Sequence, residues 1–246
     1  MLRNLLYLLP GIGRYHLLLK RLHDLEIIQN TLLFDGRWAD DSSKYMNGQK
    51  YRQSIVLELR ERLNFSLIIE TGSFIGNTTG WFAKLWYSAV VHSCEIDPRF
   101  HELAKIRCTD TNIKFFMGDS RAFLTSLPYP DDSEVAFFYL DAHWSNDLPL
   151  REELDIIIQK WPKSVVMIDD FEVPRDQGYA YDSYGKGKAL SFHDFHDFFL
   201  DNKFAAYSPS LRSSDETGFR RGMVILAIDH SLVSVLDSIP LLSRSL

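Results

Sequence analysis

The sequence predicts an α/β fold, namely a doubly wound, mostly parallel sheet of seven strands preceded by a helical N-terminal cap. From residue 66 onward, short apolar runs alternate with amphipathic stretches at the spacing of strand–helix–strand units. A glycine turn follows the first run, and an acidic residue ends or closely follows each of the first five runs. Parallel strands bring such ends to one edge of the sheet, where ligands of doubly wound sheets bind.

Apolar residues at helical spacing mark the helices between the strands, as in Leu154, Ile157 and Trp161. We expect a helical cap over residues 1–64, a core domain over 65–229 and a C-terminal tail over 230–246. The expected strands are 66–70, 90–95, 113–117, 135–140, 164–168, 204–207 and 222–228.

Length and composition fit one α/β domain with an extension, since the chain has 246 residues, of which 46% are hydrophobic. The formal net charge of -6 argues against a phosphate-binding surface, so no nucleic-acid partner is expected. Cys94 and Cys108 form no CxxC pair and are expected to be buried and reduced, which is typical of a cytoplasmic protein.

The N-terminal stretch is leucine-rich and basic, but its apolar run ends at Pro10 and Gly11 and is too short to span a bilayer. No small-residue cleavage site follows it. We expect packing helices here, in a cap on the core or in a homo-oligomer contact. A peripheral membrane contact is the alternative.

The glycine turn after the first strand predicts the ligand. Glycine lets a ligand approach the backbone because it lacks a Cβ and adopts positive φ. A dinucleotide site has the spacing G-x-G-x-x-G, whereas this chain has E-x-G-x-x-x-G, and its carboxylate repels a pyrophosphate but suits a cationic ligand. In this turn the chain resembles the class I S-adenosylmethionine-dependent methyltransferases, which have a Rossmann-like fold. The resemblance implies that S-adenosyl-L-methionine contacts Glu70, Gly72, Ser73, Gly76, Asn77 and Thr78.

Two further acids follow the next strands. Glu95 ends the second expected strand, where a carboxylate accepts hydrogen bonds from the two hydroxyls of a ribose. Asp119 and Ser120 follow the third strand and resemble the family segment that holds the adenine ring. Asp119 is expected to accept a hydrogen bond from the adenine amine, with an N-cap of the next helix as the alternative.

Three acids remain at the ends of the fourth and fifth strands, Asp141 in LDAHW and Asp169 and Asp170 in IDDF. Converging carboxylates repel each other unless a cation lies between them, and a hard divalent ion satisfies all three. These segments resemble the metal-dependent O-methyltransferases, notably the macrocin-type and cephalosporin hydroxylase-like group. The resemblance implies that Asp141, Asp169 and Asp170 bind Mg²⁺ or another divalent cation. Asp141 is also expected to contact the cofactor and to take part in catalysis.

His143 stands where that group often carries a second aspartate that acts as the base. A histidine titrates near neutrality and accepts a hydroxyl proton, so His143 is an expected catalytic residue. A structural histidine stacked on Trp144 is the alternative. The loop 179–190, with three tyrosines, is expected to be a lid over the substrate, with a plain surface loop as the alternative.

Together these features predict an S-adenosylmethionine-dependent O-methyltransferase. It would move a methyl group to a hydroxyl of a sugar or another diol-bearing small molecule, with the assistance of a divalent metal. The alternatives are a metal-independent methyltransferase of the same fold and a non-catalytic binding module. An NAD or nucleotide-sugar enzyme is disfavoured by the glycine spacing.

Overall fold

The computed structural model describes residues 19, 21–22, 24–26, 28–29, 43–131, 133–142, 147–185 and 187–246. The chain divides into two compact units, residues 1–38 and 39–246. Every described residue of the first unit is helical, as predicted for this stretch. The second unit carries the sheet. The role of residues 1–64 as a cap and the predicted domain boundaries stay predictions.

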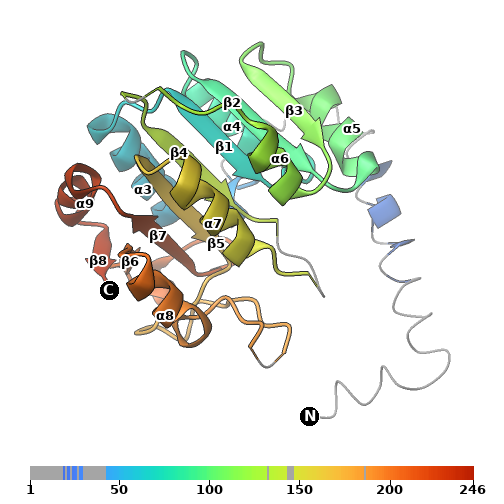
Figure 1. The fold of residues 1–246 in the computed structure, drawn as a ribbon. Coiled ribbons are helices and arrows are strands. Elements are labelled where there is room, and N and C mark those ends of the chain that lie inside the picture. The colour runs from blue at the N-terminus through green and yellow to red at the C-terminus, as the bar shows by residue number, and fades with distance from the viewer. Residues whose placement is uncertain are drawn as a thin grey trace. The chain divides into compact units, whose positions relative to one another are not determined.

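One sheet forms the centre of the second unit, and its described strands are β1 (Leu67–Thr71), β2 (Val90–Glu95), β3 (Ile113–Met117), β4 (Ala136–Leu140), β5 (Ser164–Asp169), β6 (Ala205–Pro209), β7 (Met223–Ala227) and β8 (Leu242–Arg244). Their order in the sheet is β3-β2-β1-β4-β5-β7-β6-β8 (Figure 1). The first five strands pair in parallel, whereas β7 is antiparallel to β5 and to β6, and β8 is antiparallel to β6. This is the predicted doubly wound, mostly parallel sheet.

The prediction of seven strands is corrected to eight, because β8 lies in the segment 230–246 that was expected to be a tail. β8 has three residues, and its Ser243 pairs with Ser208 of β6. The pairing gives hydrogen-bond partners to an otherwise open edge of the sheet. So short a strand has no alternation of apolar and polar residues that a sequence pattern detects.

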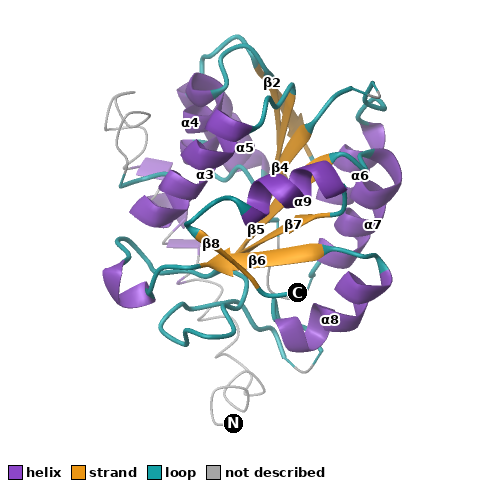
Figure 2. Ribbon diagram, turned by 90° about the vertical axis from the view of Figure 1, so that its left-hand side faces the viewer, coloured by secondary structure: helices purple, strands orange, loops and turns teal. Residues whose placement is uncertain are grey.

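Helices cover both faces of the sheet (Figure 2). In chain order, the described α-helices of this unit are α3 (Lys50–Arg62), α4 (Asn77–Leu85), α5 (Pro98–Arg107), α6 (Ser120–Ser126), α7 (Leu150–Lys160), α8 (Phe192–Asp201) and α9 (His230–Asp237). One core cluster lies under α3, α4 and α9 and includes Ile55, Phe82 and Leu236. The other lies under α6, α7 and α8 and includes Leu154 and Phe199.

Several helices begin directly after a parallel strand has ended, and this gathers helix starts at one edge of the sheet. Gly76, with a φ of 80°, precedes α4 as its N-cap. Asp97 caps α5 by accepting a hydrogen bond from the N–H of Arg99, and Pro98 occupies the first helical position. The turns after β1, β2 and β3 are therefore short, whereas Asp170 begins the long connection from β5 to α8.

Cys94 and Cys108 are both buried and free, as predicted. Among the helices that the structure describes, none has the length and apolar character needed to cross a membrane.

Candidate functional site

The predicted acids lie at the carboxyl ends of the five parallel strands. Glu70, Glu95 and Asp119 are named the β1–β3 half of this edge, and Asp141, Asp169 and Asp170 the β4–β5 half. β1 pairs with both β2 and β4, so the strand order reverses between the two halves. In doubly wound sheets, this reversal is where the ligand crevice forms.

Gly72 shapes the turn after β1 and has a φ of 87°. A Cβ at this position would lie 2.4 Å from the carbonyl oxygen of Asp141, so only glycine fits between the ends of β1 and β4. The N–H groups of Gly72 and Ser73 donate to the carbonyl oxygen of Cys94, at 3.0 and 2.9 Å. Both neighbouring strands therefore hold the turn in place.

Ser73 adds an unsatisfied polar group to this turn. Its side chain is buried, and its Oγ has no hydrogen-bond partner within the part of the chain that the structure describes. A buried hydroxyl without a partner is costly, and a polar ligand would satisfy it. The turn therefore fits the polar end of a bound cofactor.

Glu95 is buried at the end of β2 and is bonded to the same turn. Its Oε2 accepts a hydrogen bond from the N–H of Phe74 at 2.8 Å, and its Oε1 accepts one from the N–H of Asp97 at 2.8 Å. Burial raises the pKa of Glu95, and these two N–H groups oppose the rise. The carboxylate is fixed where an acid accepts hydrogen bonds from vicinal hydroxyls.

Glu70 is more deeply placed, with 1% of its surface exposed. Its Oε2 accepts hydrogen bonds from the hydroxyl of Thr79 and, at 2.6 Å, from that of Ser93. Burial raises the pKa of Glu70 to about 7, while these two hydroxyls lower it. Glu70 therefore ties β1 to β2 and α4, and its predicted contact with a cationic ligand stays a prediction.

The side chains at the start of α4 have partners within the protein. Asn77 Oδ1 accepts a hydrogen bond from Arg107 at 2.9 Å, and Thr78 Oγ1 accepts one from the N–H of Met46 at 3.1 Å. A Cβ at Gly76 would lie 2.7 Å from the sulfur of Cys108, so this glycine allows α5 to approach. The predicted cofactor contacts of Gly76, Asn77 and Thr78 stay predictions.

Asp119 is the N-cap of α6, which is the alternative that the sequence left open. Its Oδ1 accepts hydrogen bonds from the N–H groups of Arg121 and Ala122, at 2.9 and 3.3 Å. The guanidinium of Arg121 donates to Oδ2 at 2.6 Å and is the largest cause of the lowered pKa of Asp119. Ser120 is buried as the first residue of α6. Their predicted contacts with adenine stay predictions.

Three exposed apolar side chains in this half were missed by the sequence analysis. Phe74, Ile96 and Met117 are 39%, 64% and 55% exposed. Ile96 directly follows Glu95, and Met117 pairs with Glu95 across β2 and β3. Apolar surface beside a buried acid suits a flat ring that carries polar groups. An apolar residue directly after a strand-ending acid is the signal that would have found Ile96.

Asp169 ends β5 and has four hydrogen-bond donors. Oδ1 accepts hydrogen bonds from the guanidinium of Arg52 and, at 2.7 Å, from the N–H of Asp170. Oδ2 accepts hydrogen bonds from the amide of Asn47, at 3.1 Å, and from the hydroxyl of Tyr139. An ionised carboxylate has about four lone-pair positions, so these donors occupy all of them.

The charge of Asp169 is balanced by Arg52. Burial raises the pKa of Asp169, and the charge of Arg52 opposes that rise. Burial also lowers the pKa of Arg52, but Asp169 and the other neighbouring acidic groups together raise it above its ordinary value. The donor set of Asp169 fits its ionised form, because three of the four donors are N–H groups that cannot accept a proton in return.

A second arginine holds Asp170. Its Oδ1 accepts a hydrogen bond from Arg221 Nε at 2.6 Å, and the same guanidinium donates to Asp182. Asp170 has a φ of 54°, and its carbonyl oxygen accepts a hydrogen bond from the N–H of Asp182 at 2.9 Å. The end of β5 is therefore tied to the loop 179–190 through both side chain and backbone.

Asp141 shares the electrostatic environment of these two acids. Burial, followed by the charges of Asp169 and Asp170, raises the pKa of Asp141 well above its ordinary value. The N–H of Asp141 donates to the carbonyl oxygen of Thr71 at 2.9 Å, which fixes Asp141 beside the glycine turn. Asp141 therefore lies within electrostatic range of Asp169 and Asp170.

The donor set does not fit the predicted metal. Within the described residues, no group of three histidine, cysteine, aspartate or glutamate side chains is placed to hold a metal ion. Asp169 supplies a physical reason, because protein donors occupy its acceptor positions and Arg52 balances its charge. Two of the three predicted ligands are paired with guanidinium groups, Asp169 with Arg52 and Asp170 with Arg221.

His143 and the loop 179–190 are the remaining predicted features of the site. His143 lies outside the described residues, so its role as a base stays a prediction. In the loop 179–190, Tyr179 is buried and donates to the carbonyl oxygen of Leu211 at 3.2 Å, so it cannot stack on a ligand. Tyr184 donates to Asp182, and Tyr181 is 42% exposed.

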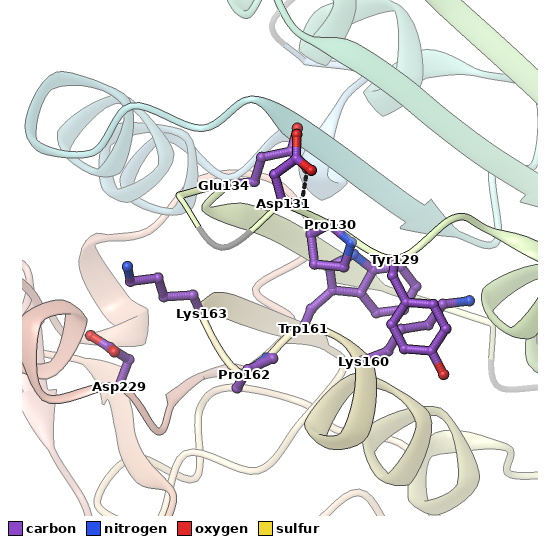
Figure 3. A pocket seen from close by; sticks show the side chains of 9 residues that line it. All are labelled: Tyr129, Pro130, Asp131, Glu134, Lys160, Trp161, Pro162, Lys163 and Asp229. Atoms are coloured by element: carbon purple, nitrogen blue, oxygen red, sulfur yellow. Dashed lines mark hydrogen bonds between the residues drawn. The ribbon is translucent and has the colours of Figure 1, made fainter.

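A hollow of about 430 Å³ lies at the opposite edge of the sheet (Figure 3). Glu134 and Lys163 precede β4 and β5, and Asp229 follows the antiparallel β7, so these lining residues mark the amino ends of the parallel strands. Lys160, another lining residue, donates to the carbonyl oxygen of Thr125 at 2.8 Å, at the end of α6. The hollow is therefore separate from the edge that carries the acids.

Comparison with known proteins places the fold. No protein-family model and no curated protein matches the sequence. An O-methyltransferase from Bacillus cereus in complex with SAH has a TM-score of 0.55 and 15% identity, covering 83% of this chain and 88% of that chain. The O-methyltransferase TomG from Streptomyces achromogenes, involved in tomaymycin synthesis and solved in complex with SAM, has a TM-score of 0.51 and 19% identity, covering 72% of this chain and 79% of that chain.

A third solved structure, a mutant of MtNAS in complex with S-adenosylmethionine, has a TM-score of 0.52 and 15% identity, covering 87% of this chain and 75% of that chain. Likeness at such low identity shows the fold alone. The chain shares the Rossmann-like α/β fold of the two O-methyltransferases, as the sequence predicts.

Proposed function

We propose that this protein is an S-adenosylmethionine-dependent O-methyltransferase that acts on a hydroxyl of a small molecule. The observation that carries the proposal is the turn at Gly72, which lies against Asp141 and is bonded through Phe74 to Glu95. Ser73 adds a buried hydroxyl that has no partner among the described residues. Solved O-methyltransferases that share the fold support the proposal.

Each part of the cofactor has proposed contacts. Glu95 accepts hydrogen bonds from the ribose hydroxyls, because its carboxylate is held at the end of β2. Asp119 and Ser120 contact the polar edge of adenine, and Ile96 and Met117 contact its faces. The proposed contacts of the methionine part are Glu70, Gly72, Ser73, Gly76, Asn77, Thr78 and Asp141.

Asp141 and His143 are the proposed catalytic residues. The bound cofactor supplies a methyl group that is already activated on a sulfonium, whereas an alcohol is a poor nucleophile until its proton leaves. The backbone of Asp141 is fixed beside the glycine turn, and the carboxylate of Asp141 in its ionised form can accept the proton of the hydroxyl. A fixed carboxylate also orients the acceptor hydroxyl toward the methyl group.

No step is assigned to Mg²⁺ or to another divalent cation. The predicted ligands Asp169 and Asp170 are paired with Arg52 and Arg221. This observation favours transfer without a metal, which is the alternative that the sequence left open.

The acceptor is proposed to be a sugar or another diol-bearing small molecule. The loop 179–190 brings Tyr181 and Tyr184 beside Asp182, whose N–H is bonded to Asp170. A cytoplasmic location, a homo-oligomer, a peripheral membrane contact and the lack of a nucleic-acid partner are proposals that rest on the sequence alone.

Transfer of a radiolabelled methyl group from S-adenosylmethionine to a panel of sugars, glycosides and catechols tests the proposal. We expect labelled product in the presence of a chelator, and a rate lower by about a hundredfold or more in Asp141→Asn, because a positioned base contributes about this much. A chain that binds the cofactor in calorimetry but labels no acceptor would favour the non-catalytic binding module.

A further inference from the structure

Arg52 belongs to α3, yet its guanidinium lies in the β4–β5 half of the strand edge. Arg52 and Asp169 are 117 residues apart in the chain. Both side chains are 1% exposed. The second terminal nitrogen of Arg52 donates to the carbonyl oxygens of Arg221 and Gly222. One buried guanidinium therefore joins the end of β5 to the residues that precede β7.

The segment Met46–Gly48 supplies another donor to Asp169. Its three residues have φ values of 51°, 59° and 68°, a left-handed conformation that side chains rarely adopt. The bond from the Met46 N–H to Thr78 and a bond of 3.0 Å from the N–H of Phe219 to the Asn47 carbonyl oxygen hold the segment. A strained backbone persists only where the surrounding structure holds it in place. In this conformation the amide of Asn47 donates a hydrogen bond to Asp169.

A divalent cation beside Asp169 would meet two obstacles. The acceptor positions of the carboxylate are occupied by four donors from the protein. The guanidinium of Arg52 already lies against Oδ1, and two cations close together in a buried environment repel each other strongly. The single guanidinium of Arg221 likewise lies against Asp170 and also contacts Asp182.

We propose that Arg52 takes the place of a divalent metal ion beside Asp169, and that Arg52 and Asn47 are positioning residues that fix this half of the site without a metal. The inference rests on the proposed function in one respect, namely that the methyl acceptor binds at the β4–β5 half. The replacement of the cation is a property of the folded chain, so it is tested without measuring methyl transfer.

Titration of the full chain with Mn²⁺, followed by the electron paramagnetic resonance signal of free Mn²⁺, tests the proposal. The wild-type chain is expected to bind no Mn²⁺ through Asp169, with or without S-adenosylmethionine, so its titration should match that of Asp169→Asn. A wild-type chain that binds one Mn²⁺, lost in Asp169→Asn, overturns the proposal. Mn²⁺ binding is measured independently of methyl transfer. A failure of the proposal about Arg52 can therefore be distinguished from a failure of the proposed function.

The Arg52→Met variant sharpens the test, because it removes the guanidinium and keeps Asp169. It is expected to bind Mn²⁺ at least about tenfold more tightly than the wild type, since a buried carboxylate without its counter-charge attracts a cation. Adding Asp169→Asn should abolish the gain. Arg62→Met removes an exposed arginine of the same helix and should leave Mn²⁺ binding unchanged.

A folded Arg52→Met chain with the Mn²⁺ affinity of the wild type would contradict the proposed place of Arg52. Should Arg52→Met fail to fold, the comparison of the wild type with Asp169→Asn decides the question by itself.

Discussion

The two halves of the strand edge hold their acids by different means. In the β1–β3 half, Glu95 accepts hydrogen bonds from nearby backbone N–H groups, and Glu70 accepts them from two hydroxyls. In the β4–β5 half, Asp169 and Asp170 are held by guanidinium groups from elements far away in the chain. Glu70 and Glu95 therefore have neutral partners, whereas Asp169 and Asp170 are each paired with an arginine. Asp119, the third acid of the β1–β3 half, is paired with Arg121.

This difference separates the proposed roles of the halves. Neutral donors fix a carboxylate without cancelling its charge, so Glu95 retains the capacity to bind hydroxyl groups of a ligand. Arg52 and Arg221 offset part of the negative charge of Asp169 and Asp170, although the charges of these two acids still raise the pKa of Asp141. The second half is therefore an electrostatic framework around Asp141.

The largest expected effect follows from breaking the charged pair. Arg52→Met should lower the free energy of unfolding by about 3–5 kcal/mol, because it leaves a buried carboxylate without its partner. Arg62→Met, which breaks an exposed pair on the same helix, should cost about 0–1 kcal/mol. Urea denaturation followed by circular dichroism measures both values. Equal losses in the two variants would show that burial of the pair has no special importance.

Adding Asp169→Asn to Arg52→Met provides a control, because the neutral amide needs no counter-charge. The double variant should be more stable than Arg52→Met. A further loss of stability would mean that Asp169 is important for a reason other than its pairing with Arg52.

A second expected effect concerns Glu70, whose pKa is raised from 4.5 to about 7 by burial. The unfolded chain releases this proton at lower pH than the folded chain does, so stability falls as the pH rises from about 4.5 to about 7. The size of the loss is about 3 kcal/mol, at about 1.4 kcal/mol for each pKa unit.

Glu70→Gln should remove this part of the pH dependence, which is measured as the free energy of unfolding of each variant at about pH 5 and about pH 8. Glu61→Gln, at an exposed position of α3, is the matched control and should keep the dependence of the wild type. A dependence that is identical in Glu70→Gln and in the wild type would show that Glu70 does not titrate in this range.

The smallest expected effect concerns the cap of α6. Asp119→Ala removes the acceptor of two backbone N–H groups and should cost about 1 kcal/mol of stability. Asp119→Asn keeps a capping oxygen and should cost less. If both variants weaken S-adenosylmethionine binding without affecting stability, the adenine contact is the main role of Asp119 and the cap is secondary.

The sequence was informative where the determinants are local. Gly72, Glu95 and the strand ends lie in short segments whose periodicity and glycine spacing reflect the backbone directly. The position of Asp141, Asp169 and Asp170 at one edge of the sheet was also predictable, because the parallel strands β4 and β5 end at the same edge. Both predictions depend on local sequence alone and not on side chains that come from distant parts of the chain.

Prediction from the sequence failed where the partners of a site residue lie far away in the chain. Arg52 and Asn47 reach Asp169 from 117 and 122 residues away, and no local pattern in α3 or before it marks them as part of a site. Without these partners, three converging acids indicate a metal ion. Tyr179 illustrates the same limit, since a tyrosine in a polar loop is buried through its contact with Leu211.

Calorimetric titration with S-adenosylmethionine tests the central claim most directly, because it measures whether the β1–β3 half binds this cofactor. The wild-type chain is expected to bind one molecule, and Glu95→Gln should weaken binding by about tenfold or more, since a lost charge-assisted hydrogen bond is worth about 1.5–3 kcal/mol. Glu102→Gln, at an exposed position of α5, should bind as the wild type does. An absence of binding to the folded wild type, or equal affinities of the wild type and Glu95→Gln, would contradict the account.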